Sequence, residues 1–391
     1  MVIKYQIYLL GLIYLTGCSG NSKLPEHFEF IKVSKQKSLS FAQKNLSAYN
    51  LFPSSAVYPG SDSILVYNVY HHTLDMIQFK NNTAEVLHGF TLADDGPEAV
   101  KIPKSIILTN GHVILPQIHN ISVLDNKGKT LKNFSLLKNP AFKNMSNPVF
   151  TGTHSHEMGN FNNQYNNESF TYYFYVKDLL SSYSGLFGLD ILNDTIVKLP
   201  DIFDKNLLDQ HEIKYSDGKV TMMKDDFPFI LYHDNKIFIS YFASSQIDYY
   251  DLDSEKSFNI SIETYNFESQ KSKPKPIPPE KKFSEAMGFN EEWDNEVAFG
   301  RLEVLPSEKG YYRFIKGPSV GGAKEFDVFL EIYDIGLTKK SEINLSNLNS
   351  DLGLLHFPIS SSIVVKAKSQ MSDDEFLYYE IMIQDSFFDM E

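Results

Sequence analysis

A repeated unit of two short strands joined by a tight turn constrains the fold more than any other feature of this sequence. Its clearest copy is residues 328–345, in which Phe329, Glu331 and Tyr333 alternate with the residues between them. That is the period of two that side chains have on a strand. Asp334 and Gly336 then break the run before a second apolar stretch begins. The pattern predicts a strand, a turn that starts at an acidic residue, and a second strand.

Weaker copies of this unit recur along the chain. In residues 105–137 we expect four strands in succession, with Asn110-Gly111 as a hairpin turn and Asp125 at the end of the third strand. Four short antiparallel strands in a row are typical of one blade of a β-propeller. The equivalent positions in the six units are Gln78, Asp125, Asp190, Asp251, Asp334 and Met382. The chain is therefore predicted to be all-β, a β-propeller of six blades, with seven blades as the next alternative.

The longest interval between units holds an inserted segment, residues 268–300. It starts with a proline-rich run at 273–279, which cannot be a central strand because proline lacks the backbone donor. Residues 280–293 then predict a short helix with Phe283 and Met287 on one face. Either the segment covers a sheet edge, or it is a binding arm that carries Trp293, the only tryptophan.

The N-terminus indicates a cell compartment. An apolar run at 7–14 precedes Leu15-Thr16-Gly17-Cys18, the lipobox pattern of a bacterial lipoprotein signal peptide. The alternative, a transmembrane anchor, needs about 20 apolar residues, roughly twice what the run provides. We therefore expect a signal peptide at 1–17, lipidated Cys18 and a tether at 18–45, and the propeller at 46–391. Cys18 is the only cysteine, so no disulfide within the chain can form.

The charge balance argues against nucleic acid as a partner. The formal net charge is −13, and the chain has no run of lysine and arginine that could neutralise phosphates. Hydrophobic residues make up 42% of the chain, which is enough for a core and excludes global disorder. The sequence lacks the motifs of the commonest hydrolases and nucleotide enzymes, and we expect no cofactor.

Three acidic residues, Asp94, Asp95 and Glu98, gather around Gly96-Pro97 between the first and second units. A pair of carboxylates could act as acid and base in glycoside cleavage, or could ligate calcium, although the spacing of a calcium loop is absent. A solvated loop between two blades is the simpler interpretation. These acids are the candidate ligand-facing carboxylates.

Arg313 is the candidate ligand-facing cation, because it lies in an aromatic run, Tyr311-Tyr312-Arg313-Phe314. On an innermost strand its guanidinium would face the central channel and could hold an anionic ligand. The alternative is a buried arginine paired with a neighbouring acid. His154 and His156 could share one face of a strand, but no third ligand is identifiable and no metal site is predicted.

Taken together, these features resemble the Bacteroidetes-type β-propeller lipoproteins of a domain-of-unknown-function family, akin to six-bladed NHL-like propellers. The features are the lipobox, the strand–turn–Asp units, the loop at Asp95-Gly96-Pro97 and the run at 311–314. The resemblance covers residues 46–391, and it implies a propeller fold and an envelope location. It implies no activity and no catalytic residues. Residues 19–23 lack the acidic cluster that follows the cysteine in many surface-exported lipoproteins, which favours a periplasm-facing protein.

The function predicted is a non-enzymatic binding or scaffold propeller, lipid-anchored in the outer membrane and monomeric, with an unknown protein or glycan as its partner. The alternative is an envelope enzyme, for example a glycan-acting hydrolase or lyase with carboxylates in the channel. A purely structural role within an envelope complex is a third hypothesis. Buried, close-set carboxylates in one pocket would favour the enzyme, and scattered, solvated acids would favour binding.

Overall fold

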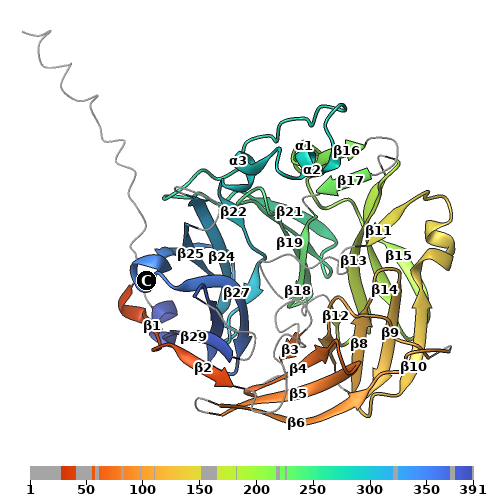
Figure 1. The fold of residues 1–391 in the computed structure, drawn as a ribbon, viewed down its shortest axis with the longest axis horizontal. Coiled ribbons are helices and arrows are strands. Elements are labelled where there is room, and N and C mark those ends of the chain that lie inside the picture. Colours follow the sequence, from red (N-terminus) through yellow and green to blue (C-terminus); the bar gives the residue numbers. More distant parts are fainter. Residues whose placement is uncertain are drawn as a thin grey trace, which may run out of the picture.

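Six sheets are arranged as blades around a common axis in the computed structural model (Figure 1). The structure describes residues 28–40, 55–57, 61–80, 83–96, 98–109, 111–150, 165–181, 183–216, 221–224, 227–319, 325–369 and 375–389. Each blade is antiparallel, and its strands are lettered A to D from the centre outward. The prediction of a six-bladed propeller is confirmed.

The first three blades follow one another along the chain. Blade 1 is built from β3 (Ser55–Val57), β4 (Ser63–Asn68), β5 (Thr73–Lys80) and β6 (Thr83–Thr91). Blade 2 is built from β7 (Ile107–Leu108), β8 (His112–Pro116), β9 (Asn120–Asp125) and β10 (Thr130–Ser135). In blade 3, strand A is split into β11 (Pro148–Phe150) and β12 (Tyr165–Asn166), followed by β13 (Thr171–Asp178), β14 (Ser184–Asp190) and β15 (Thr195–Lys198). The 3₁₀ turns η3 (Leu136–Lys138) and η4 (Pro140–Phe142) connect blades 2 and 3.

The remaining blades complete the ring. Blade 4 is built from β18 (Phe229–His233), β19 (Lys236–Ser240), β20 (Ile247–Asp251) and β21 (Lys256–Ile260). Blade 5 has a split strand A, β22 (Ala298–Phe299) and β23 (Glu303–Val304), and then β24 (Gly310–Ser319), β25 (Phe326–Asp334) and β26 (Lys339–Asn344). After η5 (Leu345–Asn347), blade 6 contributes β27 (Leu352–Ile359), β28 (Ser362–Ala367) and β29 (Glu375–Ile383), and η6 (Asp385–Asp389) ends the described chain.

The N-terminal segment supplies the missing strand D of blade 6. After η1 (Phe28–Phe30), β1 (Ile31–Val33) and β2 (Lys37–Ser40) both pair with β29, so the two ends of the chain close the ring together (Figure 1). An ion pair between Lys37 and Glu380 at 2.7 Å joins the two segments. The tether expected over residues 18–45 therefore overlaps the propeller, which begins by Ile31 rather than at residue 46. A last blade of three strands would expose an unpaired edge, and pairing with the N-terminus removes it.

The acidic residue that marks each repeat has a structural role. All six equivalent positions lie at or near the end of strand C, as the alignment of the repeats predicted. In four blades the aspartate accepts main-chain N–H groups of the turn to strand D: Asp125 from Lys127 and Lys129, Asp190 from Leu192 and Asn193, Asp251 from Asp253 and Ser254, and Asp334 from Gly336 and Thr338. The carboxylate thus holds the tight turn in place of water.

The hydrophobic core is divided among the interfaces between blades. One cluster joins each neighbouring pair, for example Leu65 of blade 1 with Val113 of blade 2, and Ile64 of blade 1 with Phe357 of blade 6. Aromatic rings fill the widest interfaces, such as Phe142 and Phe174 between blades 2 and 3. The abundance of tyrosine and phenylalanine in the sequence follows from this sheet-on-sheet packing.

Two insertions lie together at the edge of blade 4 (Figure 1). The first, between blades 3 and 4, contains α1 (Lys205–Gln210), β16 (Ile213–Ser216) and β17 (Thr221–Lys224), and Asp204 caps α1. The second is the proline-rich segment between blades 4 and 5. Its predicted helix is two short ones, α2 (Phe283–Met287) and α3 (Glu291–Asp294), because the helix ends at Gly288. The Tyr215 hydroxyl donates to the Lys281 carbonyl at 2.7 Å and so ties the two insertions together.

Among the described residues, the structure has no helix with the length and apolar character needed to cross a membrane.

Candidate functional site

The acidic loop predicted as a candidate site connects β6 to β7. Asp94, Asp95 and Glu98 are all exposed to solvent. Asp94 lies 3.2 Å from Nε2 of His72, and the Glu98 carbonyl accepts a hydrogen bond from the Thr130 hydroxyl at 3.0 Å. These contacts attach the loop to blades 1 and 2, and its carboxylates line neither of the cavities described below.

The position expected for Arg313 is wrong. The residue lies on β24, strand B of blade 5, and its side chain is fully buried rather than facing the channel. Its Nε donates to Oε2 of Glu331 at 2.8 Å, and other guanidinium nitrogens donate to the hydroxyl of Tyr333 and the carbonyl of Ser245. The alternative considered from the sequence, a buried arginine paired with a neighbouring acid, describes the structure. Arg313 and Glu331 sit directly opposite each other on adjacent strands, which explains the pairing.

The pair belongs to a larger network between blades 4 and 5. Lys339 binds both Glu331, at 2.7 Å, and Glu342. Glu342 in turn accepts the main-chain N–H groups of Tyr265 and Asn266 in the segment that follows blade 4. Burial disfavours the charged form of Glu331, but Arg313 and Lys339 outweigh it and hold its pKa below the usual range. The carboxylates of Glu331 and Glu342 are therefore bridged by Lys339. Because Glu342 also binds the segment that follows blade 4, this network joins blades 4 and 5.

A second buried network joins blades 5 and 6. Glu303 on β23 accepts a hydrogen bond from Tyr312 at 2.6 Å and lies 3.3 Å from Arg301 and 3.5 Å from His356 on β27. Burial opposes ionisation of Glu303, but His356 and Arg301 overcome it and lower its pKa to about 2. The ring of His356 stacks on Phe314 at 4.0 Å between centroids. A carboxylate that stays ionised and paired in this way is suited to an ion pair and not to donating a proton.

A set of exposed apolar side chains distinguishes one face of blades 1 to 3. The turns between strands B and C, together with the connections from one blade to the next, form one face of the ring, here called the BC face. Seven large apolar residues there are between 39% and 71% exposed: Val69, Tyr70, Ile102, Ile118, Leu137, Leu180 and Tyr183. Single exposed apolar residues are ordinary, so a candidate interaction surface depends on several of them lying on one face.

The contacts of these residues place them around three successive BC turns. Val69 and Tyr70 are in the turn of blade 1, Ile118 in that of blade 2, and Leu180 and Tyr183 in that of blade 3. The connections that carry Ile102 and Leu137 adjoin the turn of blade 2. The N–H of Lys101 donates to the Gln117 side chain, and the N–H of Leu136 donates to the His119 carbonyl.

The BC turn of blade 4 is covered by the second insertion. The N–H of Ser245 donates to the Ser269 carbonyl, and the N–H of Lys271 donates to the Ala243 carbonyl, both at 2.8 Å. Trp293 is only 4% exposed, its ring nitrogen donates to the Ser272 carbonyl, and the Lys271 amine lies over its ring. The sequence predicted either a cover of a sheet edge or a binding arm; these contacts are to a turn, and Trp293 points into the protein.

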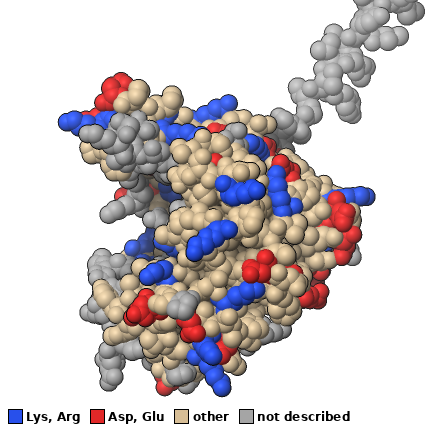
Figure 2. Space-filling view, turned by 90° about the vertical axis from the view of Figure 1, so that its right-hand side faces the viewer, with Lys and Arg blue, Asp and Glu red and all other residues tan. Residues whose placement is uncertain are grey.

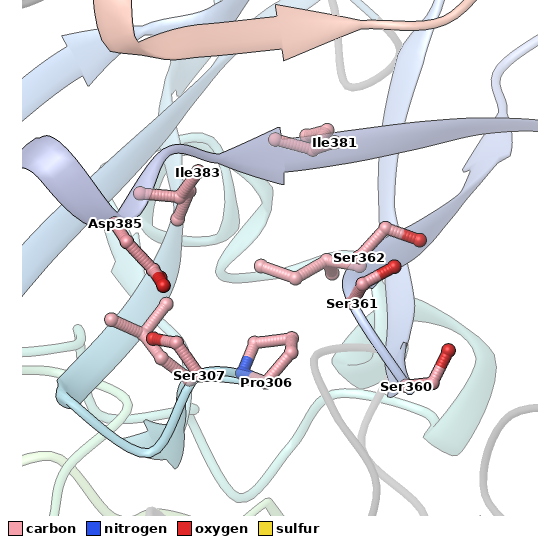
Figure 3. A pocket seen from close by; sticks show the side chains of 10 residues that line it. Pro306, Ser307, Ser360, Ser361, Ser362, Ile381, Ile383 and Asp385 are labelled. Carbon is pink, nitrogen blue, oxygen red and sulfur yellow. The ribbon is translucent and has the colours of Figure 1, made fainter. Parts of the chain in front are cut away.

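Two cavities open between blades on the opposite face. One, of about 290 Å³, lies between blades 5 and 6 and is lined by Leu305, Pro306, Ser307, Ser360, Ser361, Ser362, Ile363, Ile381, Ile383 and Asp385 (Figure 3). The other, of about 200 Å³, lies between blades 2 and 3 and is mostly apolar, with Leu131 and Leu192 exposed at it. On the outer side of the molecule seen in Figure 2, basic and acidic side chains are interspersed without an extended basic patch.

Two other sequence candidates, Cys18 and the pair His154 and His156, lie outside the described residues. Among the residues that are described, no group of three or more histidine, cysteine or acidic side chains could hold a metal ion. Sequence reasoning missed the apolar BC face. The available signal was apolar residues in the short segments between strands, such as Val69-Tyr70 beside His71-His72, where polar residues are expected.

The chain is similar to a protein family and to solved structures. The model of a family described as "Domain of unknown function (DUF4221)" matches residues 50–343. A crystal structure of a DUF4221 member from Bacteroides vulgatus is similar with a TM-score of 0.59 at 11% identity, covering 90% of this chain and 99% of that one. A putative exported protein from Bacteroides fragilis gives a TM-score of 0.48 at 10% identity, covering 92% and 97%. The search of curated proteins found no match.

Proposed function

The chain belongs to the DUF4221 family, a domain of unknown function, and we propose that it is a non-enzymatic binding or scaffold propeller of the bacterial cell envelope. In this proposal the BC face of blades 1 to 3 binds a protein partner. The observation that carries the proposal is the set of seven exposed apolar residues on that face. A ring of packed sheets is rigid, so its turns can hold such a surface in a fixed shape.

The energetics favour a buried role for this face. A leucine or tyrosine side chain moved from water into an interface contributes on the order of 1.5–3 kcal/mol. Interfaces are enriched in aromatic anchors such as Tyr70 and Tyr183, which lose little side-chain entropy on binding. Tyr70 and Leu180 are the most exposed of the seven, and they lie on different blades. They are therefore the best residues to test.

The enzyme alternative has less support. The buried carboxylates with shifted pKa values, such as Glu303 and Glu331, are held by cations between blades. The acids of the predicted loop are solvated, as expected for the binding alternative. No described cavity is lined by the two carboxylates that glycoside cleavage requires.

The surface is tested by cross-linking the protein in intact envelopes of its native host. The double variant Tyr70→Asp, Leu180→Asp places charges on the BC face, and it should lower the cross-linked fraction at least tenfold, since each 1.4 kcal/mol is a factor of ten. Val197→Asp is the matched control, because Val197 is 59% exposed but lies on the outer strand β15. Equal cross-linking of the double variant and the control would overturn the proposed surface.

The envelope location rests on the lipobox at Leu15-Thr16-Gly17-Cys18. We propose that Cys18 is lipidated and tethers the propeller to the outer membrane on its periplasmic side. The variant Cys18→Ala should then appear in the soluble fraction, whereas Ser22→Ala should stay with the membrane. Recovery of the Cys18→Ala protein in the membrane pellet at the level of the control would contradict lipid anchoring.

A further inference from the structure

The cavity between blades 5 and 6 is built from three separate segments. Leu305, Pro306 and Ser307 belong to the turn from strand A to strand B of blade 5. The corresponding turn of blade 6 and the end of β29 supply the other walls. At about 290 Å³ the cavity is near the lower limit for small-molecule sites. It can therefore enclose one side chain or a ligand of similar size.

The lining has an apolar floor and one polar end. Leu305, Ile363 and Ile381 are at most 2% exposed and belong to the core between the two blades. Figure 3 shows the Asp385 carboxylate and the Ser307 hydroxyl toward the same end of the cavity, whereas the hydroxyls of Ser361 and Ser362 point away from them. A ligand therefore meets aliphatic surface along its body and two oxygen acceptors at its end.

The charge of the polar end selects the ligand. Asp385 is the only ionisable residue in the lining. Its nearest cation is Lys309, 3.7 Å away, and the two side chains are 42% and 66% exposed. An exposed ion pair of this length contributes little, so a ligand cation can replace Lys309 at the Asp385 carboxylate.

We propose that this cavity binds an ammonium group that is attached to an aliphatic body. Examples are the N-terminal residue of a peptide with an aliphatic side chain, or the side chain of a lysine. The ammonium lies between the Asp385 carboxylate and the Ser307 hydroxyl, and the aliphatic body lies on Ile363, Ile381 and Ile383. An anionic ligand would be repelled by Asp385, and Lys309 is not among the residues that line the cavity. The site goes beyond the proposed function, since it lies on the opposite face of the ring.

The test compares ligands that share a body and differ in charge. L-leucinamide carries an ammonium beside an isobutyl group, and N-acetyl-L-leucinamide is the same molecule without the charge. Leucinamide should bind several-fold more tightly, because its ammonium can pair with the Asp385 carboxylate and the acetylated amine cannot. A third ligand, Nα-acetyl-L-lysinamide, presents only a side-chain ammonium. Comparing it with leucinamide shows whether the cavity prefers a peptide N-terminus or a lysine side chain. Affinities are measured by ligand-observed NMR with the propeller, residues 24–391.

Three variants locate the binding within the cavity. Asp385→Asn should weaken leucinamide binding several-fold, and Ser307→Trp should abolish it by filling the cavity from an exposed position. Lys309→Ala should strengthen binding several-fold, because it removes the competing cation. Asp389→Asn is the matched control, since Asp389 is an exposed acid of the same 3₁₀ helix outside the lining. Equal binding of leucinamide and its acetylated form, or binding that survives Ser307→Trp, would overturn the proposal.

Discussion

Arg313 and Glu331 form an ion pair with no exposed surface in blade 5. Two charges in this position have lost their hydration, and their hydrogen bonds to each other, to Tyr333, to Lys339 and to the Ser245 carbonyl offset that cost. Removal of one partner leaves the other charged and buried, so it costs far more than loss of a surface pair. The pair therefore matters for folding of the blade more than for recognition.

We predict that Arg313→Met lowers the free energy of unfolding by about 3–5 kcal/mol, as measured by urea denaturation. Lys340→Met is the control, because Lys340 pairs with Asp334 near the surface at 3.1 Å, where both side chains are partly exposed. Its loss should cost less than about 1 kcal/mol. A loss for Arg313→Met no larger than that of the control would contradict the account of the network.

Asp190 is predicted to link stability to pH. Hydrogen bonds from the Asn193 main chain and side chain, and from Leu192, hold its pKa below the usual range. The stabilisation is present above the unfolded-state pKa, near 3.9, and is lost as the pH falls through the lower folded-state pKa. Asp190→Asn keeps the turn but cannot ionise. Its unfolding free energy should be below that of the wild type at pH 7, and the difference should shrink below about pH 4. A difference independent of pH would contradict this prediction.

The role of these aspartates could be read from the sequence, whereas the partner of Arg313 could not. A turn contact joins residues two to four positions apart, so the repeated strand–Asp–turn pattern contains all the information. Arg313 and Glu331 lie opposite each other because of the register between β24 and β25. The length of the connection between these strands does not determine that register, so the pairing could not be read from the sequence. From the sequence, residues 311–314 could not be assigned to the innermost strand or to the next one. The true innermost strand is split into two pieces of two residues each, which are too short to recognise in a sequence.

β1 and β2 close the ring and are the elements that the sequence did not assign to the propeller. They are three and four residues long, and they are rich in lysine and serine, so their pattern resembles a tether. Their pairing with β29 spans nearly the whole chain, and a contact of that range leaves no local signal. Longer strands, such as β25 and β9, were predicted with the correct turns.

Removal of the closing strands should open blade 6. A truncated protein of residues 41–391 leaves β29 as an unpaired edge and loses the Lys37–Glu380 ion pair, and burial of Ile31 is lost with it. We expect its melting temperature to fall by several °C relative to residues 24–391, because several kcal/mol of pairing and burial are lost. A synthetic peptide of residues 28–40 added in excess should restore part of the difference. Identical melting of the two proteins would contradict closure by the N-terminus.

The whole ring is asymmetric. The insertions cover the BC turn of blade 4, while the BC turns of blades 1 to 3 expose aromatic and aliphatic side chains. The number and order of blades could be predicted from the repeats, because each unit carries its own strand pattern. The BC face could not be predicted in this way, because its seven residues come from five turns and connections that lie on one face only after the ring has closed. The same holds for the cavity beside Asp385, whose walls come from three segments of blades 5 and 6.

Hydrogen–deuterium exchange in two states can show whether the BC face of blades 1 to 3 is the binding surface. The exchange of the purified propeller is compared with that of the same protein in the native envelope fraction. The account predicts slower exchange in the envelope at the turns that carry Tyr70, Ile118 and Leu180, and unchanged exchange at the opposite turns that carry Asp125 and Asp251. Protection confined to the opposite turns, or no protection on either face, would contradict it.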